Sequence, residues 1–330
     1  MTDLSLRPSP NRPITLEDLA GDRNAARPDT WFRAGAKAAG YLVLVILAAI
    51  AVSTTIKAWP AFRTEGFGYF FRDDWVPSKG HFGARSIIYG TLVVSAIGLV
   101  VAVPLSLGIA LFITELAPRR VRSVITTVMD VLASVPSVVF GLWGFLILRP
   151  RLKNVYNDIA DAVHGVPVLR SIFGPSLSGQ SFMTAGVIVG LMIVPIITSI
   201  VREVFQTVPM NEKNGALALG ATRWEMVRGV VFPHSTGGIV GAVMLGLGRA
   251  MGETIAVALV IGASPQITAN LFGQGEAMPS VIARNLNEAS GTYQAALIGL
   301  GVGLFVLTIL INISARVLVG RVDRATKGTR

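Results

Sequence analysis

Residues 237–262 read GGIVGAVMLGLGRAMGETIAVALVIG, an apolar run long enough to cross a bilayer as a helix, with Arg249 and Glu253 near its middle. A charged side chain in the hydrocarbon core is costly unless it faces a partner or a water-filled cavity. On a continuous helix, a spacing of four residues places both charges on one face. The sequence therefore predicts a membrane helix whose two charged residues have a function and lie on the pathway of a charged solute.

The composition around this run is that of a polytopic membrane protein. Hydrophobic residues make up 52% of the 330 residues, and the mean hydropathy is +0.61. The absence of cysteine excludes disulfides and thiolate metal sites. The net charge of +10 and the pI near 10.5 then indicate Lys and Arg anchoring at the cytoplasmic face rather than nucleic-acid binding.

Apolar runs of about 20 residues predict an all-α membrane protein with six transmembrane helices. Their predicted ranges are about 38–56, 86–114, 123–148, 182–201, 237–263 and 293–315, in a membrane domain of 36–320. Pro104, Pro136 and Pro195 are expected to bend their helices. The polar, proline-containing residues 1–35 are predicted to be a disordered tail without a cleaved signal peptide, and 321–330 to be a second tail.

The distribution of basic residues predicts the orientation. With the N-terminus inside, the inner segments carry 18 Lys and Arg and the outer loops carry 10. Both termini are therefore expected to be cytoplasmic.

Residues 206–233, between the fourth and fifth predicted spans, read QTVPMNEKNGALALGATRWEMVRGVVFP. They predict a short amphipathic helix, a turn at Gly220 and a second helix that starts at Thr222 and stops before Pro233. Thr222 is a suitable N-cap, and Glu225 three residues later completes a capping box. On spacing alone, an ordinary structured loop is the alternative.

This segment resembles the EAA loop of ABC importer permeases, in which an acidic residue and two alanines are followed by a glycine and a hydrophobic-x-hydrophobic-Pro ending. Gly220 matches the glycine, and residues 230–233 (VVFP) match the ending. Asn214 stands where the family has its acid, which puts one usual salt bridge to the ATPase in question. The resemblance implies that the helix–turn–helix docks into a groove on a cytoplasmic ATPase and passes on its motion. The residues expected to couple to the ATPase are Asn214, Gly215, Ala216, Gly220, Thr222, Arg223, Glu225 and Pro233.

Other stretches resemble the permeases of phosphate ABC importers. Residues 246–257 (GLGRAMGETIAV) are similar to their fifth span, 135–144 (VPSVVFGLWG) to the third, and 89–92 (YGTL) and 102–110 (AVPLSLGIA) to the second. The likeness covers about 82–315, and the GETIAV ending with the long loop after the third span favours the C-type permease over its A-type partner. It implies a type I ABC importer permease fold in a bacterial inner membrane. It also implies a second, A-type permease, two copies of an ATPase subunit and an extracytoplasmic phosphate-binding protein as partners.

The chemistry of the charged pair agrees with an anionic substrate. A guanidinium stays charged in any environment and binds phosphate oxygens through a fork of donors. We expect Glu253 to pair with Arg249 when no phosphate is bound, and phosphate to compete for it. The alternative is a structural ion pair that ties the fifth span to a neighbour. Gly248 and Gly252 form a small-residue pair that lets another helix approach closely.

The sequence also limits the other functions. It has no Gly-x-x-x-x-Gly-Lys-Ser/Thr run, so the energy for transport must come from a partner. No histidine spacing suits a metal and no recognisable catalytic set is present, so neither an enzyme nor a cofactor is expected. The open alternatives are a permease for another oxyanion, such as sulfate or molybdate, and an ion-coupled secondary transporter or channel that uses Arg249 and Glu253 without an ATPase. The coupling segment opposes the latter.

Overall fold

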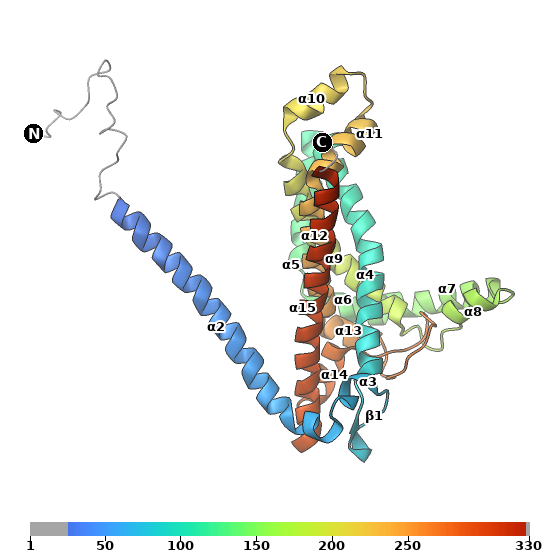
Figure 1. The fold of residues 1–330 in the computed structure, drawn as a ribbon. Coiled ribbons are helices and arrows are strands. Elements are labelled where there is room, and N and C mark those ends of the chain that lie inside the picture. The colour runs from blue at the N-terminus through green and yellow to red at the C-terminus, as the bar shows by residue number, and fades with distance from the viewer. Residues whose placement is uncertain (1–25, 328–330) are drawn as a thin grey trace, which may run out of the picture. The chain divides into compact units, whose positions relative to one another are not determined.

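The structure is a computed structural model that describes residues 26–327, with side chains from 31 to 317. Most of the predicted N-terminal tail (1–25) and residues 328–330 lie outside the described residues. Contacts divide the chain into two units, residues 1–53 and 54–330, with the boundary inside helix α2 (Ala26–Glu65) (Figure 1). Residues 26–35, expected to belong to the disordered tail, form the start of α2, and Pro28 lies in its first turn, where proline is tolerated.

The described part of the second unit consists of helices joined by loops, the longest at 261–277, with β1 and β2 forming a short antiparallel ribbon of two residues each. Its elements in chain order are α3 (Gly68–Phe71), β1 (Trp75–Val76), η1 (Pro77–Lys79), β2 (His81–Phe82), α4 (Arg85–Leu111), η2 (Phe112–Leu116), α5 (Arg119–Ser134), α6 (Ser137–Trp143), η3 (Gly144–Leu148), α7 (Arg149–Ala162), α8 (Pro167–Ile172), α9 (Phe182–Gln206), α10 (Met210–Ala218), α11 (Arg223–Met226), η4 (Val227–Val231), α12 (Phe232–Met251), α13 (Ile255–Val260), α14 (Met278–Asn285) and α15 (Gly291–Lys327). The turns η2, η3 and η4 are π-helical.

Five helices of the described chain are long and apolar enough to cross a membrane. They span 31–65, 85–116, 182–206, 223–251 and 291–317. A sixth span is formed if the bent pair 119–134 and 137–162 is counted as one. The all-α membrane fold is therefore confirmed.

Helix α9 forms the core of the second unit, packed against α4 and α12. Its isoleucines Ile188 and Ile197 are fully buried. Glycines allow α4 and α9 to pack backbone to backbone: a Cβ on Gly190 would lie 3.0 Å from the carbonyl oxygen of Gly98. Close approach through small residues is the usual basis of helix packing inside membranes.

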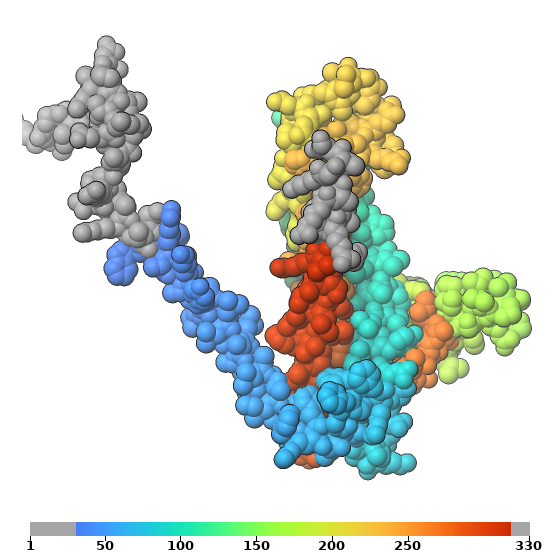
Figure 2. Space-filling model, in the orientation of Figure 1, coloured from blue at the N-terminus to red at the C-terminus, as the bar shows by residue number. Residues whose placement is uncertain are grey.

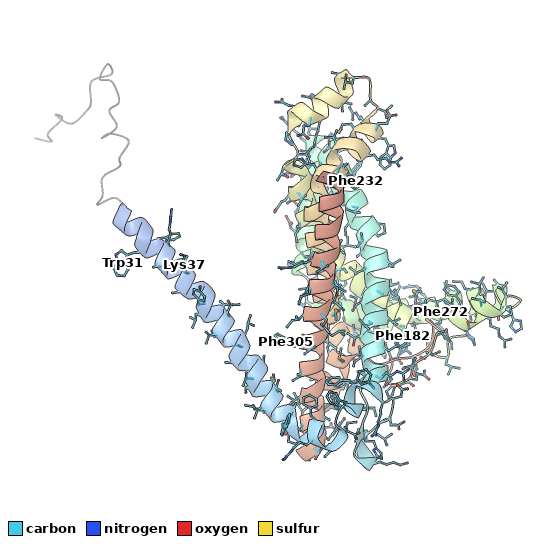
Figure 3. All side chains as sticks on the ribbon, viewed as in Figure 1. Trp31, Lys37, Phe182, Phe232, Phe272 and Phe305 are labelled. Atoms are coloured by element: carbon cyan, nitrogen blue, oxygen red, sulfur yellow. The ribbon has the colours of Figure 1, made fainter. Side chains whose placement is uncertain are left out.

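A smaller hydrophobic cluster closes the end of the unit that carries α3 and the ribbon. The buried Tyr69 hydroxyl donates to the Ala296 carbonyl at 2.6 Å, and Phe82 stacks on Tyr293. Helices α10 and α11 stand out as a separate lobe at the opposite end (Figures 1 and 2). In Figure 3, Phe232, at the start of α12, lies toward the end that carries α10 and α11, and Phe182, at the start of α9, lies nearer the other end.

Candidate anion site and coupling segment

The bend expected at Pro136 is a full break. Helix α5 ends at Ser134, α6 begins at Ser137, and the direction of the helical run 137–162 differs from that of α5 by 91°. Val135 and Pro136 have extended backbone, since proline has no N–H to donate and disfavours a helical conformation in the residue before it. The third predicted span therefore turns sideways partway across.

The fifth predicted span is broken as well. Helix α12 ends at Met251 and α13 begins at Ile255. Gly252 is the C-cap of α12, and a carboxylate oxygen of Glu253 accepts the N–H of Ala256 at 3.4 Å in the first turn of α13. The prediction that Arg249 and Glu253 share one face of a continuous helix was wrong.

The two breaks lie at a similar depth, and their short helices pack together. At 1.5 Å per residue, α5 is about 24 Å long and Arg249 lies about 26 Å along α12 from the end near the coupling segment. Helix α6 presents Gly141 to α13, where a Cβ would lie 2.7 Å from the Cα of Ala256. Gly144 of η3 closely approaches the side chain of Ile188 in α9. Gly141 therefore lets α6 and α13 approach each other closely.

A cavity of 460 Å³ lies where they meet. Its lining residues are Ser137, Arg249, Gly252, Glu253, Thr254 and Ile255. Arg249 is exposed, whereas the side chains of Ser137, Glu253 and Thr254 are on half-buried residues. The structure thus places both predicted pathway residues at one cavity, although on opposite sides of a helix break.

The expected resting ion pair is not formed. In the part of the chain that the structure describes, Arg249 makes neither an ion pair nor a hydrogen bond, and Glu253 is used by the backbone of α13. A guanidinium that is free within the described chain can donate several hydrogen bonds to a tetrahedral oxyanion. The Glu253 carboxylate lines the same cavity.

The expected packing role of the Gly248–Gly252 pair is not seen within the described chain. A Cβ on Gly248 would meet nothing within 4 Å, and one on Gly252 would contact only carbonyls of its own helix. This face of α12 is open to solvent, ligand or another chain.

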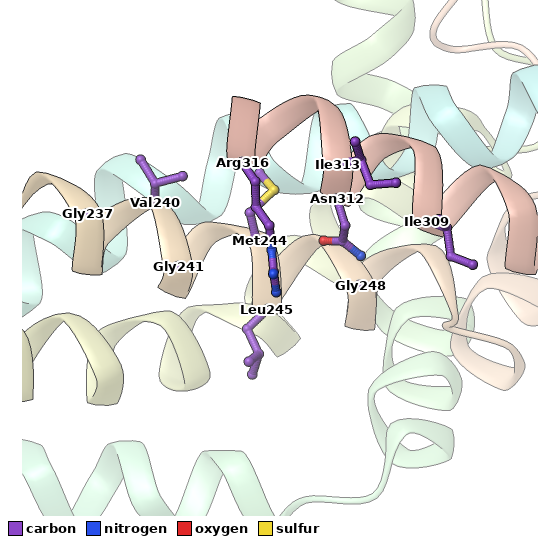
Figure 4. A pocket seen from close by; sticks show the side chains of 10 residues that line it. All are labelled: Gly237, Val240, Gly241, Met244, Leu245, Gly248, Ile309, Asn312, Ile313 and Arg316. Carbon is purple, nitrogen blue, oxygen red and sulfur yellow. The ribbon is translucent and has the colours of Figure 1, made fainter. Parts of the chain in front are cut away.

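A larger cavity, of 780 Å³, separates α12 from α15 (Figure 4). From α15 it is lined by Asn312 and Arg316, among others, and from α12 by Val240, Met244 and Leu245 together with Gly237, Gly241 and Gly248. Gly248 borders this cavity, and Arg249, next in sequence, borders the smaller one.

The coupling segment forms the predicted helix–turn–helix. Gly220 makes the turn with φ +88°, a conformation that favours glycine. Thr222 caps α11: its hydroxyl accepts the Glu225 N–H at 3.3 Å, and the Glu225 carboxylate accepts the Thr222 N–H at 2.7 Å. Asn214, Gly215 and Ala216 lie on α10.

Pro233 does not end the second helix, contrary to prediction. The helical run continues from Arg223 to Met251, with Pro233 in the first turn of α12. The π-turn η4 immediately before it widens the hydrogen-bond ladder, which accommodates a residue without an N–H. The coupling segment is therefore joined by a continuous helical run to Arg249.

Sequence reasoning missed four residues. Ser137 and Thr254 line the anion cavity, and Lys213 of α10 forms a buried ion pair with Glu115 of η2. Ser137 lies in the VPSVVFGLWG motif, whose proline signalled an irregular backbone. Lys213 carried no signal, because its partner is 98 residues away in sequence.

The family model described as "Binding-protein-dependent transport system inner membrane component" matches residues 87–328. The chain belongs to this family. Membership makes it a transport component of the inner membrane, a non-catalytic permease, and implies a binding protein and an ATPase as partners.

Several curated relatives of this permease match it over most of its length. A Mesorhizobium japonicum protein named "Phosphate transport system permease protein PstC" is 42% identical over 306 residues, covering 92% of this chain and 94% of the relative. Its Haemophilus influenzae namesake is 40% identical, covering 87% and 91%. "Phosphate transport system permease protein PstC 2" of Mycobacterium tuberculosis is 38% identical, covering 90% and 94%.

Solved structures agree on the fold of the permease. A chain of a bacterial alginate ABC transporter in complex with an alginate pentasaccharide-bound periplasmic protein superimposes with a TM-score of 0.61 at 15% identity, covering 91% of this chain and 97% of that chain. A second structure, of a bacterial ABC transporter that imports alginate, gives a TM-score of 0.51 at 14% identity, covering 89% and 97%. The permease therefore has the ABC importer permease fold.

Proposed function

We propose that this permease is the membrane-spanning subunit of an ATP-driven importer of inorganic phosphate. Its relatives are named as phosphate transport permeases at about 40% identity over some 90% of the chain. The observation on the chain itself that carries the proposal is the exposed guanidinium of Arg249, which has no partner among the described residues, in the cavity between the two broken helices. A charge in that position is costly unless an anion or water meets it.

Within this cavity, Arg249 binds two phosphate oxygens through its fork of N–H donors, and Ser137 donates a third hydrogen bond. Glu253 keeps a negative charge at the same site, which lowers the affinity of the cavity for phosphate and allows the phosphate to be released. This revises the expected swap: Glu253 opposes the bound anion without pairing with Arg249 beforehand.

The subunits of the proposed importer are those of an ABC importer that depends on a binding protein. The permease pairs with a second, A-type permease above two copies of an ATPase subunit, and an extracytoplasmic phosphate-binding protein delivers the substrate. Both termini are cytoplasmic, as the bias of Lys and Arg favours. The lobe of α10 and α11 is then cytoplasmic, because it lies at the same end of the unit as the end of α15 (Figure 1).

The lobe carries the ATPase contact. Its exposed apolar side chains include Met210, Leu219 and Trp224, which are 64%, 91% and 62% exposed. The predicted coupling residues keep their roles: Asn214, Gly215 and Ala216 on α10, Gly220 in the turn, Thr222, Arg223 and Glu225 at α11, and Pro233 at the junction with α12. Exposed apolar groups rimmed by polar residues are typical of protein interfaces.

Substrate identity is tested by uptake of labelled phosphate in cells that lack their own C-type permease but retain the other subunits. Uptake that is restored by the chain, abolished by an ATPase-inactive partner and unaffected by excess sulfate or molybdate supports the proposal. Competition by sulfate or molybdate assigns the permease to another oxyanion, and uptake without an active ATPase indicates an ion-coupled transporter.

A further inference from the structure

Helix α10 is anchored through a lysine. Of its nine residues, only Lys213 is buried, at 7% exposure, while the larger apolar residues Met210 and Leu217 are 64% and 40% exposed. A helix on a protein surface ordinarily buries its apolar face and leaves lysine in water. The reversed arrangement indicates that the contact made by Lys213 is specific.

The Lys213 ammonium binds the ends of two central helices. Its Nζ donates to Oε1 of Glu115 at 2.6 Å and to the carbonyl oxygen of Phe205, in the last turn of α9, at 3.4 Å. The side chains of Lys213 and Glu115 are 9% and 13% exposed. A pair so protected from water is screened little by salt, and losing one partner leaves a buried charge unpaired.

Glu115 sits in a firmly built corner. The π-turn η2 closes with a 2.7 Å hydrogen bond from the Ala117 N–H to the Phe112 carbonyl, and Arg122 of α5 donates to the Thr114 carbonyl at 3.0 Å. Helix α5 leaves this corner and runs without interruption to Ser134. Three residues later, Ser137 lines the anion cavity.

We propose that the Lys213–Glu115 ion pair is a mechanical link that carries movement of α10 to α5 and thus to the Ser137 side of the cavity. The Arg249 side already has its own connection, the continuous helical run from Arg223 to Met251. The coupling segment therefore acts on both walls of the cavity, one through the backbone and one through this pair. Lys213 is a positioning residue that touches neither substrate nor ATP.

This inference rests on the proposed ATPase coupling, and it differs from a merely structural anchor in one measurable respect. An anchor affects how much complex assembles, whereas a link affects how much substrate moves for each ATP hydrolysed. Spatial intermediacy alone does not demonstrate a coupling path, so the test must measure coupling itself.

The experiment uses the complete complex, with partner permease, ATPases and binding protein, in proteoliposomes. Labelled phosphate uptake and ATP hydrolysis are measured together for Lys213→Gln, Glu115→Gln, the conservative Lys213→Arg and the charge swap Glu115→Lys with Lys213→Glu. Glu203→Gln, which removes an exposed carboxylate from the same end of α9, is the matched control.

We expect Lys213→Gln and Glu115→Gln to hydrolyse ATP in response to the binding protein but to move about two- to thirtyfold less phosphate per ATP. Lys213→Arg and the charge swap should recover most of the loss, and Glu203→Gln should match the wild type. Unchanged phosphate per ATP in both single variants overturns the link. If the single variants do not assemble, the charge-swap variant decides the question. A swap complex that assembles and moves the wild-type amount of phosphate per ATP supports the link. A swap variant that moves less phosphate per ATP, or that does not assemble either, overturns it.

A failure of the proposed function can be distinguished from a failure of the link. If the wild-type complex moves no phosphate but moves another anion, the same ratio is measured with that anion, and the comparison between variants still tests the link.

Discussion

At the scale of single residues, the two charges of the apolar run have different roles. Arg249 is exposed in a cavity and makes no ion pair in the described part of the chain, while Glu253 accepts a backbone N–H of α13. The helix break between them separates the charges, which leaves the guanidinium available to an anion. A continuous helix would have allowed the two to neutralise each other.

Ser137 should contribute one hydrogen bond to the bound anion. We expect Ser137→Ala to reduce the efficiency of phosphate uptake by about tenfold, since a hydrogen bond to a charged group contributes about 1.5 kcal/mol or more. The loss should appear as a raised KM in uptake assays at equal expression. The control is Ser171→Ala on α8, an exposed serine that bonds only to the Val168 carbonyl. An unchanged KM for Ser137→Ala would remove this residue from the site.

Glu253→Gln should strengthen phosphate binding and slow transport. Removing a negative charge from the cavity favours the anion, so the Kd of the assembled complex for phosphate should fall while the rate of uptake also falls. Equilibrium binding of labelled phosphate and initial uptake rates check the two halves, with Asp158→Asn on exposed α7 as control. Weaker binding in Glu253→Gln would contradict the opposing role of this carboxylate.

The residues found from the sequence were those whose chemistry conflicts with their surroundings. Arg249 stood out because arginine is costly in an apolar run. Ser137 and Thr254 did not, because serine and threonine occur in membrane helices for many reasons. Only the meeting of two breaks, far apart in sequence, makes Ser137 a neighbour of Arg249.

At the scale of elements, the two broken helices define the site. Pro136 indicated an irregularity, but a proline can bend a helix slightly or end it. The direction changes by 91° between α5 and the run 137–162, and α13 packs against Gly141 of that run. Likewise, the coupling helix continues past Pro233 by way of the π-turn η4, and the sequence did not predict this turn.

The glycine at the crossing of α6 and α13 should not tolerate even a methyl group. Gly141→Ala places a Cβ 2.7 Å from the Cα of Ala256, so we expect about 1–3 kcal/mol of destabilisation. Gly108→Ala, in α4, meets nothing within 4 Å and should be neutral or slightly stabilising. Thermal unfolding of the purified complexes compares the two, and equal midpoints would mean that α6 and α13 do not pack this closely.

At the scale of the whole molecule, apolar runs located the spans because hydrocarbon must be crossed by about 20 apolar residues in any fold. The composition could not reveal that the third span turns sideways, since a broken helix is as apolar as a continuous one. The buried pair of Lys213 and Glu115 was equally hidden, because it joins segments 98 residues apart.

The orientation can be tested directly, because the chain contains no cysteine. Single cysteines introduced at Ser9 and Thr329 should react with a membrane-impermeant maleimide only after the inner membrane has been made permeable. A cysteine at Lys79, in the ribbon region, should react from outside. Labelling of the two terminal positions in intact cells would show that the orientation is the reverse of the predicted one.

The central claim is that Arg249 handles the transported anion, and labelled phosphate uptake by Arg249→Gln tests it most directly. The assay uses cells that lack their own C-type permease, at equal expression, with Arg151→Gln on exposed α7 as a control that also removes one guanidinium. We predict that uptake is lost in Arg249→Gln, partly retained in Arg249→Lys, which keeps the charge without the fork, and normal in Arg151→Gln. Phosphate uptake by Arg249→Gln at the wild-type rate would contradict the account.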